Sequence, residues 1–151
     1  MKRTFFKSSL LTLVSGVLIM ASGCQTGDGI FLKEQPYSLN EIRRAIGIIS
    51  GKPRKVSDNQ REILTAYFSR KPTEGFDPNT AKERLYVHFW ILGERRPYDI
   101  RVIVMSEARS GGEYTEVGED INMSKKISNE LNEKLVQSQD GSNIIDSFRP
   151  F

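Results

Sequence analysis

The sequence has few residues of the types that build disulfides and metal sites. It contains one cysteine, Cys24, and one histidine, His88. A single cysteine cannot form an intrachain disulfide, so the fold must be stabilised by packing alone. Protein metal sites need clusters of His, Cys, Asp and Glu at defined spacing, and the sequence shows no such cluster. We therefore predict no metal, no cofactor, no catalytic residues and a protein that is not an enzyme.

Long hydrophobic runs are also scarce. The one clear run covers residues 10–20 and is shorter than the roughly 20 residues that span a bilayer. Three basic residues precede it: Lys2, Arg3 and Lys7. Small residues follow it at 21–23. A basic start, an apolar centre and a small-residue exit are typical of a secretory signal, so we predict a signal peptide over residues 1–23. The alternative is a buried N-terminal helix of the domain.

Cys24 directly follows this segment. The residues Ala21-Ser22-Gly23-Cys24 resemble the lipobox of bacterial lipoproteins, although Ala21 stands where that family usually has leucine. The resemblance implies that the Cys24 thiol carries diacylglycerol and that the mature chain begins there. Two or three acyl chains would hold the protein on a membrane almost permanently. Gln25, in place of the aspartate that retains enterobacterial lipoproteins at the inner membrane, favours the outer membrane, facing the periplasm.

The positive charge of the chain belongs largely to the segment predicted to be removed. The full sequence has 22 Lys and Arg against 19 Asp and Glu. Residues 1–23 contain three of the basic residues and no acidic one, so the mature domain is formally neutral. A neutral domain lacks the electrostatic attraction on which nucleic-acid binding depends, so we predict no nucleic-acid partner.

The remaining sequence predicts a tether over 24–36 and a single α+β domain over 37–151. The expected elements are two N-terminal helices, an antiparallel sheet of three to four strands built on the hairpin 85–107, and one later helix at about 124–138. The first helix starts at a capping box, Ser38 and Glu41. The second has a similar pair, Ser57 and Gln60, followed by apolar residues. The last residues are too apolar for a loose tail, so we expect them to dock or to add a strand. This order loosely resembles the small lipoprotein subunit of the outer-membrane β-barrel assembly machine.

The hairpin has residues of alternating character. Leu85, Val87, Phe89 and Ile91 lie on one face of the first strand and predict the core side. Tyr86, His88 and Trp90 lie on the other face. Pairing Leu92 with Pro97 across a four-residue connection makes the first face wholly apolar.

The second face of the hairpin is the candidate binding surface. Its residues, with two arginines at the hairpin tip, are Tyr86, His88, Trp90, Arg95, Arg96, Asp99 and Arg101. Aromatic residues beside arginine are enriched at binding hot spots. The alternative is that the late helix or the C-terminal segment covers this face. We predict an accessory or assembly lipoprotein that binds an envelope protein. A ligand-binding lipoprotein for a lipid, lipopolysaccharide or glycan is the alternative, and a concave pocket around Trp90 would favour it.

Overall fold

The computed structural model describes residues 27–71 and 74–146, with side chains described as far as Ser138. The predicted signal peptide, Cys24 and residues 147–151 lie outside the described residues. The described elements, in chain order, are β1 (Ile30–Gln35), α1 (Leu39–Ser50), β2 (Pro53–Val56), β3 (Glu62–Thr65), β4 (Glu83–Leu92), β5 (Tyr98–Ser110), β6 (Glu113–Glu119) and α2 (Ile121–Asp146).

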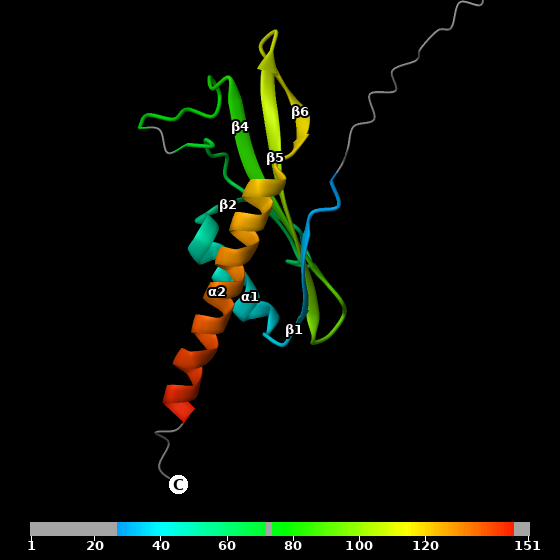
Figure 1. Cartoon of the computed structure of the whole chain (residues 1–151), viewed down its shortest axis with the longest axis vertical. Coiled ribbons are helices and arrows are strands. Elements are labelled where there is room, and N and C mark those ends of the chain that lie inside the picture. The colour runs from blue at the N-terminus through cyan, green and yellow to red at the C-terminus, as the bar shows by residue number, and fades with distance from the viewer. Residues whose placement is uncertain (1–26, 72–73, 147–151) are drawn as a thin grey trace, which may run out of the picture.

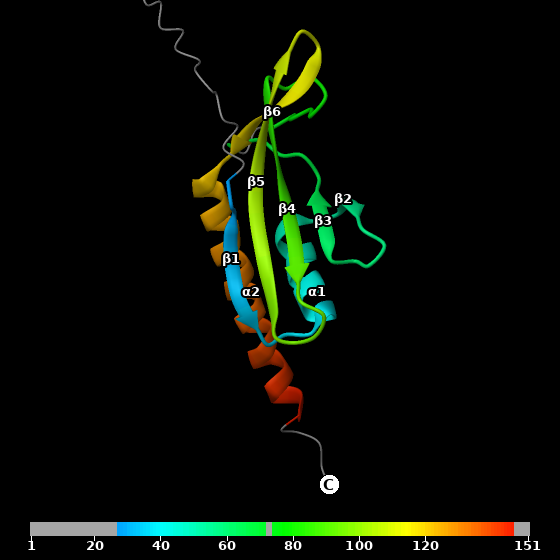
Figure 2. The ribbon, with the colours of Figure 1, turned by 90° about the vertical axis from the view of Figure 1, so that its right-hand side faces the viewer.

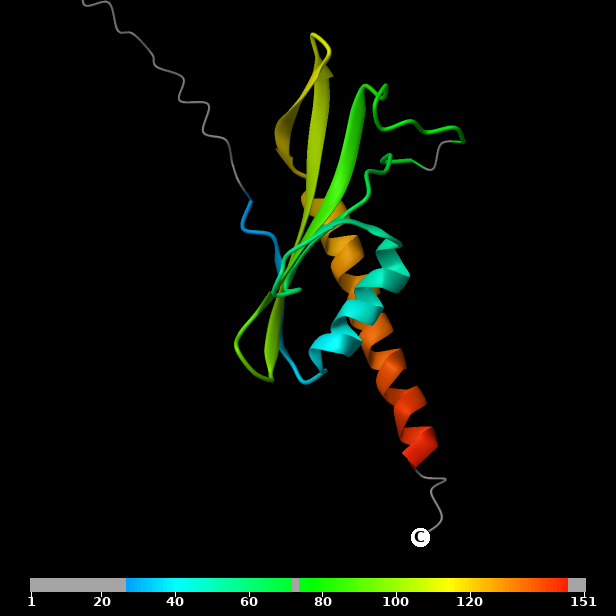
Figure 3. The ribbon, with the colours of Figure 1, turned by 180° about the vertical axis from the view of Figure 1, so that it is seen from behind.

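The strands form one antiparallel sheet in the order β1-β5-β4-β3-β2, and β6 also pairs with β5. Both helices lie on the same side of this sheet, as Figures 1 and 3 show from opposite directions. Figure 2 shows the other side, with the strands in front and the helices behind them. The molecule therefore has two layers, and we call the side without a described helix the open face.

One edge of β5 is shared by two strands. β1 pairs with β5 from Tyr98 to Val102, and β6 pairs with it from Met105 to Ser110. Between them the backbone of Val104 is paired with the start of α2. The Asp120 N–H donates to Val104 O at 2.8 Å. The Val104 N–H donates to Ser124 Oγ at 2.9 Å. The helix thus closes the gap between the two short strands.

The core lies between the sheet and the two helices. It is built from buried apolar side chains of β4, β5, α1 and α2, among them Ile42, Ile46, Leu85, Val87, Phe89, Ile91, Ile100, Val102, Val104, Leu131 and Leu135. The predicted assignment of the two faces of the first hairpin strand is confirmed, since alternate residues of a strand point to opposite faces.

The first predicted helix is confirmed together with its cap. Ser38 Oγ accepts a hydrogen bond from the Glu41 N–H at 3.3 Å, and the Glu41 carboxylate accepts one from the Ser38 N–H at 2.7 Å. These two bonds complete the capping box and lower the pKa of Glu41. The helix ends at Gly51, whose positive φ of 69° suits a residue without Cβ.

The predicted number of elements is wrong: the described residues form six strands and one N-terminal helix, not three to four strands and two N-terminal helices. The segment expected to form the second helix contains β3. Ser57 accepts from the Glu62 N–H at 2.9 Å and so closes the β2–β3 turn instead of capping a helix. A short apolar run fits the spacing of a helix as well as the alternation of a strand. Here Ile63 and Thr65 point into the core while Leu64 points away.

Part of the predicted tether, 24–36, belongs to the sheet. Residues 30–35 form β1, where Phe31 pairs with Arg101 and Leu32 pairs with Ile100. Leu32 packs against the core. A six-residue edge strand that begins after a glycine resembles a polar linker in composition, and only its pairing with β5 distinguishes the two.

The hairpin register differs from the predicted one by two residues. Leu92 pairs with Asp99, Phe89 with Val102, and Trp90 with Arg101. The connection is longer than expected because Pro97 lies in it. An even shift leaves every side chain on its predicted face, which is why the apolar pattern could not distinguish the two registers.

The late helix starts three residues before its predicted beginning and continues past its predicted end. Asp120 caps it, since its Oδ1 accepts from the Met123 N–H at 3.1 Å. The final part of α2 extends beyond the sheet in all three views. With one helix before β2 and a strand before that helix, the helix-helix-strand order that suggested the assembly-machine subunit is absent from the described chain.

Candidate interaction surface

The open face carries a row of side chains that crosses four strands. The observed register places Phe31 of β1 beside Arg101 of β5, Arg101 beside Trp90 of β4, and Trp90 beside Glu62 of β3. The Arg101 guanidinium lies 5.1 Å from the Trp90 ring centroid and 5.8 Å from that of Phe31. Such cation–π contacts restrain both rings. The row thus joins a cation, two aromatic rings and a carboxylate on one solvent-facing surface.

His88 lies next to this row, two residues before Trp90 on β4 and on the same face. Its ring stacks on Trp90 with 3.3 Å between ring centroids and an interplanar angle of 26°. His88 Nε2 is 2.6 Å from Glu62 Oε1. Burial lowers the pKa of His88, and the Glu62 carboxylate acts in the opposite direction. Ile103, not Arg101 as predicted, is the cross-strand neighbour of His88. His88 is therefore held as a support for the indole ring.

A second group on the open face alternates aromatic and arginine side chains. The Arg84 guanidinium lies 3.5 Å from the Tyr114 ring centroid and 3.7 Å from that of Tyr67. Arg54 follows, 4.2 Å from the Tyr67 centroid. Arg84 is also paired with Glu107, its Nε 2.6 Å from Glu107 Oε2. The stack joins β2, β4, β6 and the segment after β3.

Tyr86 is the member of the predicted surface that lies nearest to this stack. The edge of the Tyr67 ring meets it at 5.8 Å between centroids. Its hydroxyl donates to Glu116 Oε1 at 2.6 Å, and burial is the main cause of its raised pKa. Tyr86 is buried by its neighbours even though it points away from the helices. No sequence pattern predicts the stack, because its members are far apart in sequence and share no periodicity.

The remaining predicted surface residues are dispersed. Asp99 accepts a hydrogen bond from the Glu34 backbone N–H at 2.8 Å and so fixes the irregular end of β1. Arg95 and Arg96 are exposed in the β4–β5 connection. The structure therefore brings His88, Trp90 and Arg101 together. It places Tyr86 on the same face beside the second group, and the two tip arginines at the end of the hairpin.

The surface beside Trp90 is hollowed but not enclosed. A wide depression, open to solvent, lies where the β2–β3 turn stands next to the end of β4. It is lined by Ser57, Asp58, Asn59, Arg61, Glu62, Trp90, Ile91 and Leu92. A shallow surface of this kind suits a protein partner better than a small molecule, which needs most of its own area covered.

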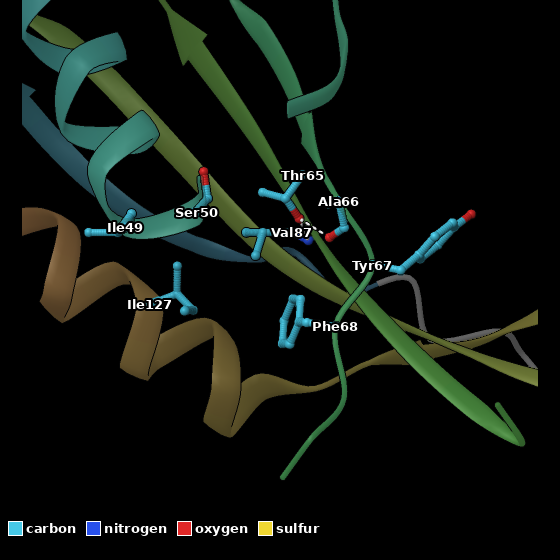
Figure 4. Close-up of a pocket in the computed structure, with 8 residues that line it drawn as sticks. All are labelled: Ile49, Ser50, Thr65, Ala66, Tyr67, Phe68, Val87 and Ile127. Atoms are coloured by element: carbon cyan, nitrogen blue, oxygen red, sulfur yellow. Dashed lines mark hydrogen bonds between the residues drawn. The ribbon is translucent and has the colours of Figure 1, made fainter. Parts of the chain in front are cut away.

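A more enclosed cavity of about 210 Å³ lies on the helix side of the sheet (Figure 4). Its lining is mostly apolar and comes from α1, α2, β4 and the segment 65–68: Ile49, Ser50, Thr65, Ala66, Tyr67, Phe68, Val87 and Ile127. The Thr65 hydroxyl accepts from the Val87 N–H and donates to Ala66 O, both at 2.9 Å. Ser50 Oγ donates to Ile46 O at 2.7 Å. These hydroxyls are already paired, so the cavity suits an apolar occupant.

Among residues 27–71 and 74–146, no three His, Cys, Asp or Glu side chains come together as a metal-binding group. In the same part of the chain no helix is long and apolar enough to cross a membrane. The sequence matches no family model, no curated protein and no solved structure.

Proposed function

We propose that this protein is a bacterial envelope lipoprotein, anchored through lipid on Cys24, whose folded part is a non-enzymatic accessory or assembly factor that binds an envelope protein. The observation that carries the binding role is the row from Phe31 through Arg101 and Trp90 to Glu62 on the open face. No described helix packs on that face. Aromatic and arginine side chains restrained by their neighbours lose little freedom on binding, and tryptophan and arginine are enriched at binding hot spots.

The anchor on Cys24 is supported by the sequence alone, since Cys24 lies outside the described residues. It predicts a mature protein that starts at Cys24 and faces the periplasm from the outer membrane. Intact mass of the membrane-purified protein should show a diacyl or triacyl adduct on Cys24. A free Cys24 thiol on a protein recovered without detergent would contradict it.

The binding half is tested by photo-crosslinking in intact cells. A photoreactive residue at position 92, two residues after an intact Trp90 on β4, should give one defined adduct with an envelope protein. The same residue at position 136, on the exposed side of α2, should not. Adding Trp90→Ala to the protein with the probe at position 92 should weaken that adduct. Equal, diffuse crosslinking from positions 92 and 136 would exclude the open face as the binding surface.

The second candidate function, a ligand-binding lipoprotein, is favoured by the apolar cavity of Figure 4. Engineered apolar cavities of roughly 150 Å³ already bind small apolar molecules. An uncharged fluorescent probe that brightens in apolar surroundings should then bind with a single saturable site. Ile127 is half-buried and points into the cavity, so Ile127→Phe should weaken the signal by filling part of it. A probe response that does not change in Ile127→Phe would exclude the cavity.

A further inference from the structure

The chain enters the described fold at the edge of the sheet where β1 and β6 follow one another along β5. Gly27 and Asp28 are held there by Arg101, whose Nη2 donates to Gly27 O at 3.3 Å and whose Nε donates to Asp28 O at 2.8 Å. The Gly29 N–H donates to Glu119 Oε2 at 3.4 Å. A Cβ on Gly27 would overlap the Glu119 carboxylate, so the two residues are in direct contact. The entry point is therefore fixed against the end of β6.

The distance from this point to the anchor is short. Gly27 stands three positions after Cys24, with two residues between them, and three positions span at most about 11 Å in a fully extended chain. Lipid on Cys24 places that residue in the headgroup region of a bilayer. The bilayer surface must then come within about the same distance of Gly27 and Glu119. This edge of the sheet cannot be far from the membrane.

The same edge exposes two aliphatic side chains. Val117 is 66% exposed and Ile121 is 53% exposed. They flank Glu119 in the sequence and line one shallow hollow together with it. Figures 1 and 2 show β6 turning into α2 beside the start of β1. Large aliphatic side chains this exposed are suited to the headgroup–acyl boundary.

We propose that this membrane-facing edge, Val117 and Ile121 beside Glu119, rests on the surface of the lipid bilayer that holds Cys24. The proposal rests on the lipid anchor proposed above. The charges that line the hollow are mixed: Glu83, Glu119 and Asp120 lie beside Arg70, which pairs with Glu83 and with Asp120. The contact is therefore apolar and imposed by the short connection, and it does not require anionic lipid.

This orientation has a consequence for the open face. β2 forms the opposite edge of the sheet, so it points away from the bilayer. The open face then stays outside the bilayer, with Trp90 and the β4–β5 connection free for a partner. The bilayer also covers the outer edges of β1 and β6, which would otherwise offer unpaired backbone groups to another strand.

The test uses the full lipidated protein reconstituted into zwitterionic phosphatidylcholine vesicles. Cysteine is introduced at one position at a time and carries a small nitroxide label; the Cys24 thiol, once alkylated, does not react. Val117→Cys and Ile121→Cys report on the proposed contact. Leu92→Cys and Val136→Cys are matched controls, because these side chains are 41% and 46% exposed and lie away from the entry point. The readout is the accessibility of each label to oxygen relative to a water-soluble nickel chelate.

We expect the labels at 117 and 121 to favour oxygen several-fold over the labels at 92 and 136. Equal, water-like accessibility at all four positions, on protein that floats with the vesicles and carries the Cys24 adduct, would overturn the proposed contact and leave the anchor intact. Protein that does not float and has no adduct would overturn both. A separate flotation and mass measurement on every sample distinguishes the two failures.

Discussion

The backbone N–H of Val104 donates a hydrogen bond to the side chain of Ser124, and this bond joins the middle of β5 to the first turn of α2. Ser124 is fully buried, and its hydroxyl also donates to Asp120 O at 2.9 Å. β4 pairs with one edge of β5 at Val104, but the other edge has no strand partner there, because β1 ends and β6 begins on either side of this residue. Ser124 thus supplies the acceptor that a neighbouring strand would supply elsewhere in the sheet.

Replacing Ser124 by alanine should be costly for this reason. The variant leaves the buried Val104 N–H without an acceptor, and such a group typically costs about 1–3 kcal/mol. Ser128 is the matched control, since it lies one turn later on α2, is equally buried, and its hydroxyl has no hydrogen-bond partner among the described residues. Urea melts should show a large loss of unfolding free energy for Ser124→Ala and little or none for Ser128→Ala. Equal losses would contradict the assigned role.

The parts of the fold that the sequence predicted are those set by local chemistry. The capping box at Ser38, the ending at Gly51 and the alternation along β4 depend on residues near one another in the chain. The open-face positions of Tyr86, His88 and Trp90 follow from the same alternation. Whether that face binds a partner is still a prediction.

The parts that the sequence did not predict depend on distant pairing. The apolar residues around Ile63 and Leu64 fit a helix as well as a strand, and only β4 on one side and β2 on the other make them β3. β1 likewise becomes a strand only through its pairing with β5. The alternating stack of Arg84 with Tyr67 and Tyr114 draws on three separate segments, so no local pattern could reveal it.

Two glycines should respond in opposite ways to alanine. Gly29 has a positive φ of 72°, and a Cβ there would overlap the Ile103 side chain. Gly29→Ala should therefore destabilise β1 and lower the unfolding free energy. Gly47 lies inside α1, and a Cβ there would meet nothing within 4 Å. Gly47→Ala should stabilise the protein by about 0.5–1 kcal/mol, because glycine is a poor helix former. Thermal melts of both variants check the signs; the same sign for both would contradict the account.

His88 should make stability depend on pH. Its folded pKa lies below the usual value of 6.5, mainly because of burial. The unfolded chain then binds more protons at this site than the folded chain, so the unfolding free energy falls as the pH drops below 6.5. Urea melts between about pH 7 and about pH 5.5 should show a smaller loss in His88→Gln than in the wild type. Identical pH profiles would show that His88 does not contribute.

Substitutions on the two faces of β4 should affect stability and partner binding differently. Phe89 is fully buried in the core, so Phe89→Ala should cost roughly 3–5 kcal/mol. Total stability for a domain of this size is on the order of 5–15 kcal/mol, so that variant could unfold. Trp90 is half-buried on the open face and touches His88 and Arg101, so Trp90→Ala should cost much less stability and should weaken the position-dependent crosslink to the envelope partner. Denaturant melts on both variants, beside the crosslinking assay on Trp90→Ala, check this. If Trp90→Ala destabilises the protein as severely as Phe89→Ala, the indole is part of the structural core, and the exposed Arg95 and Arg96 become the remaining site for a partner.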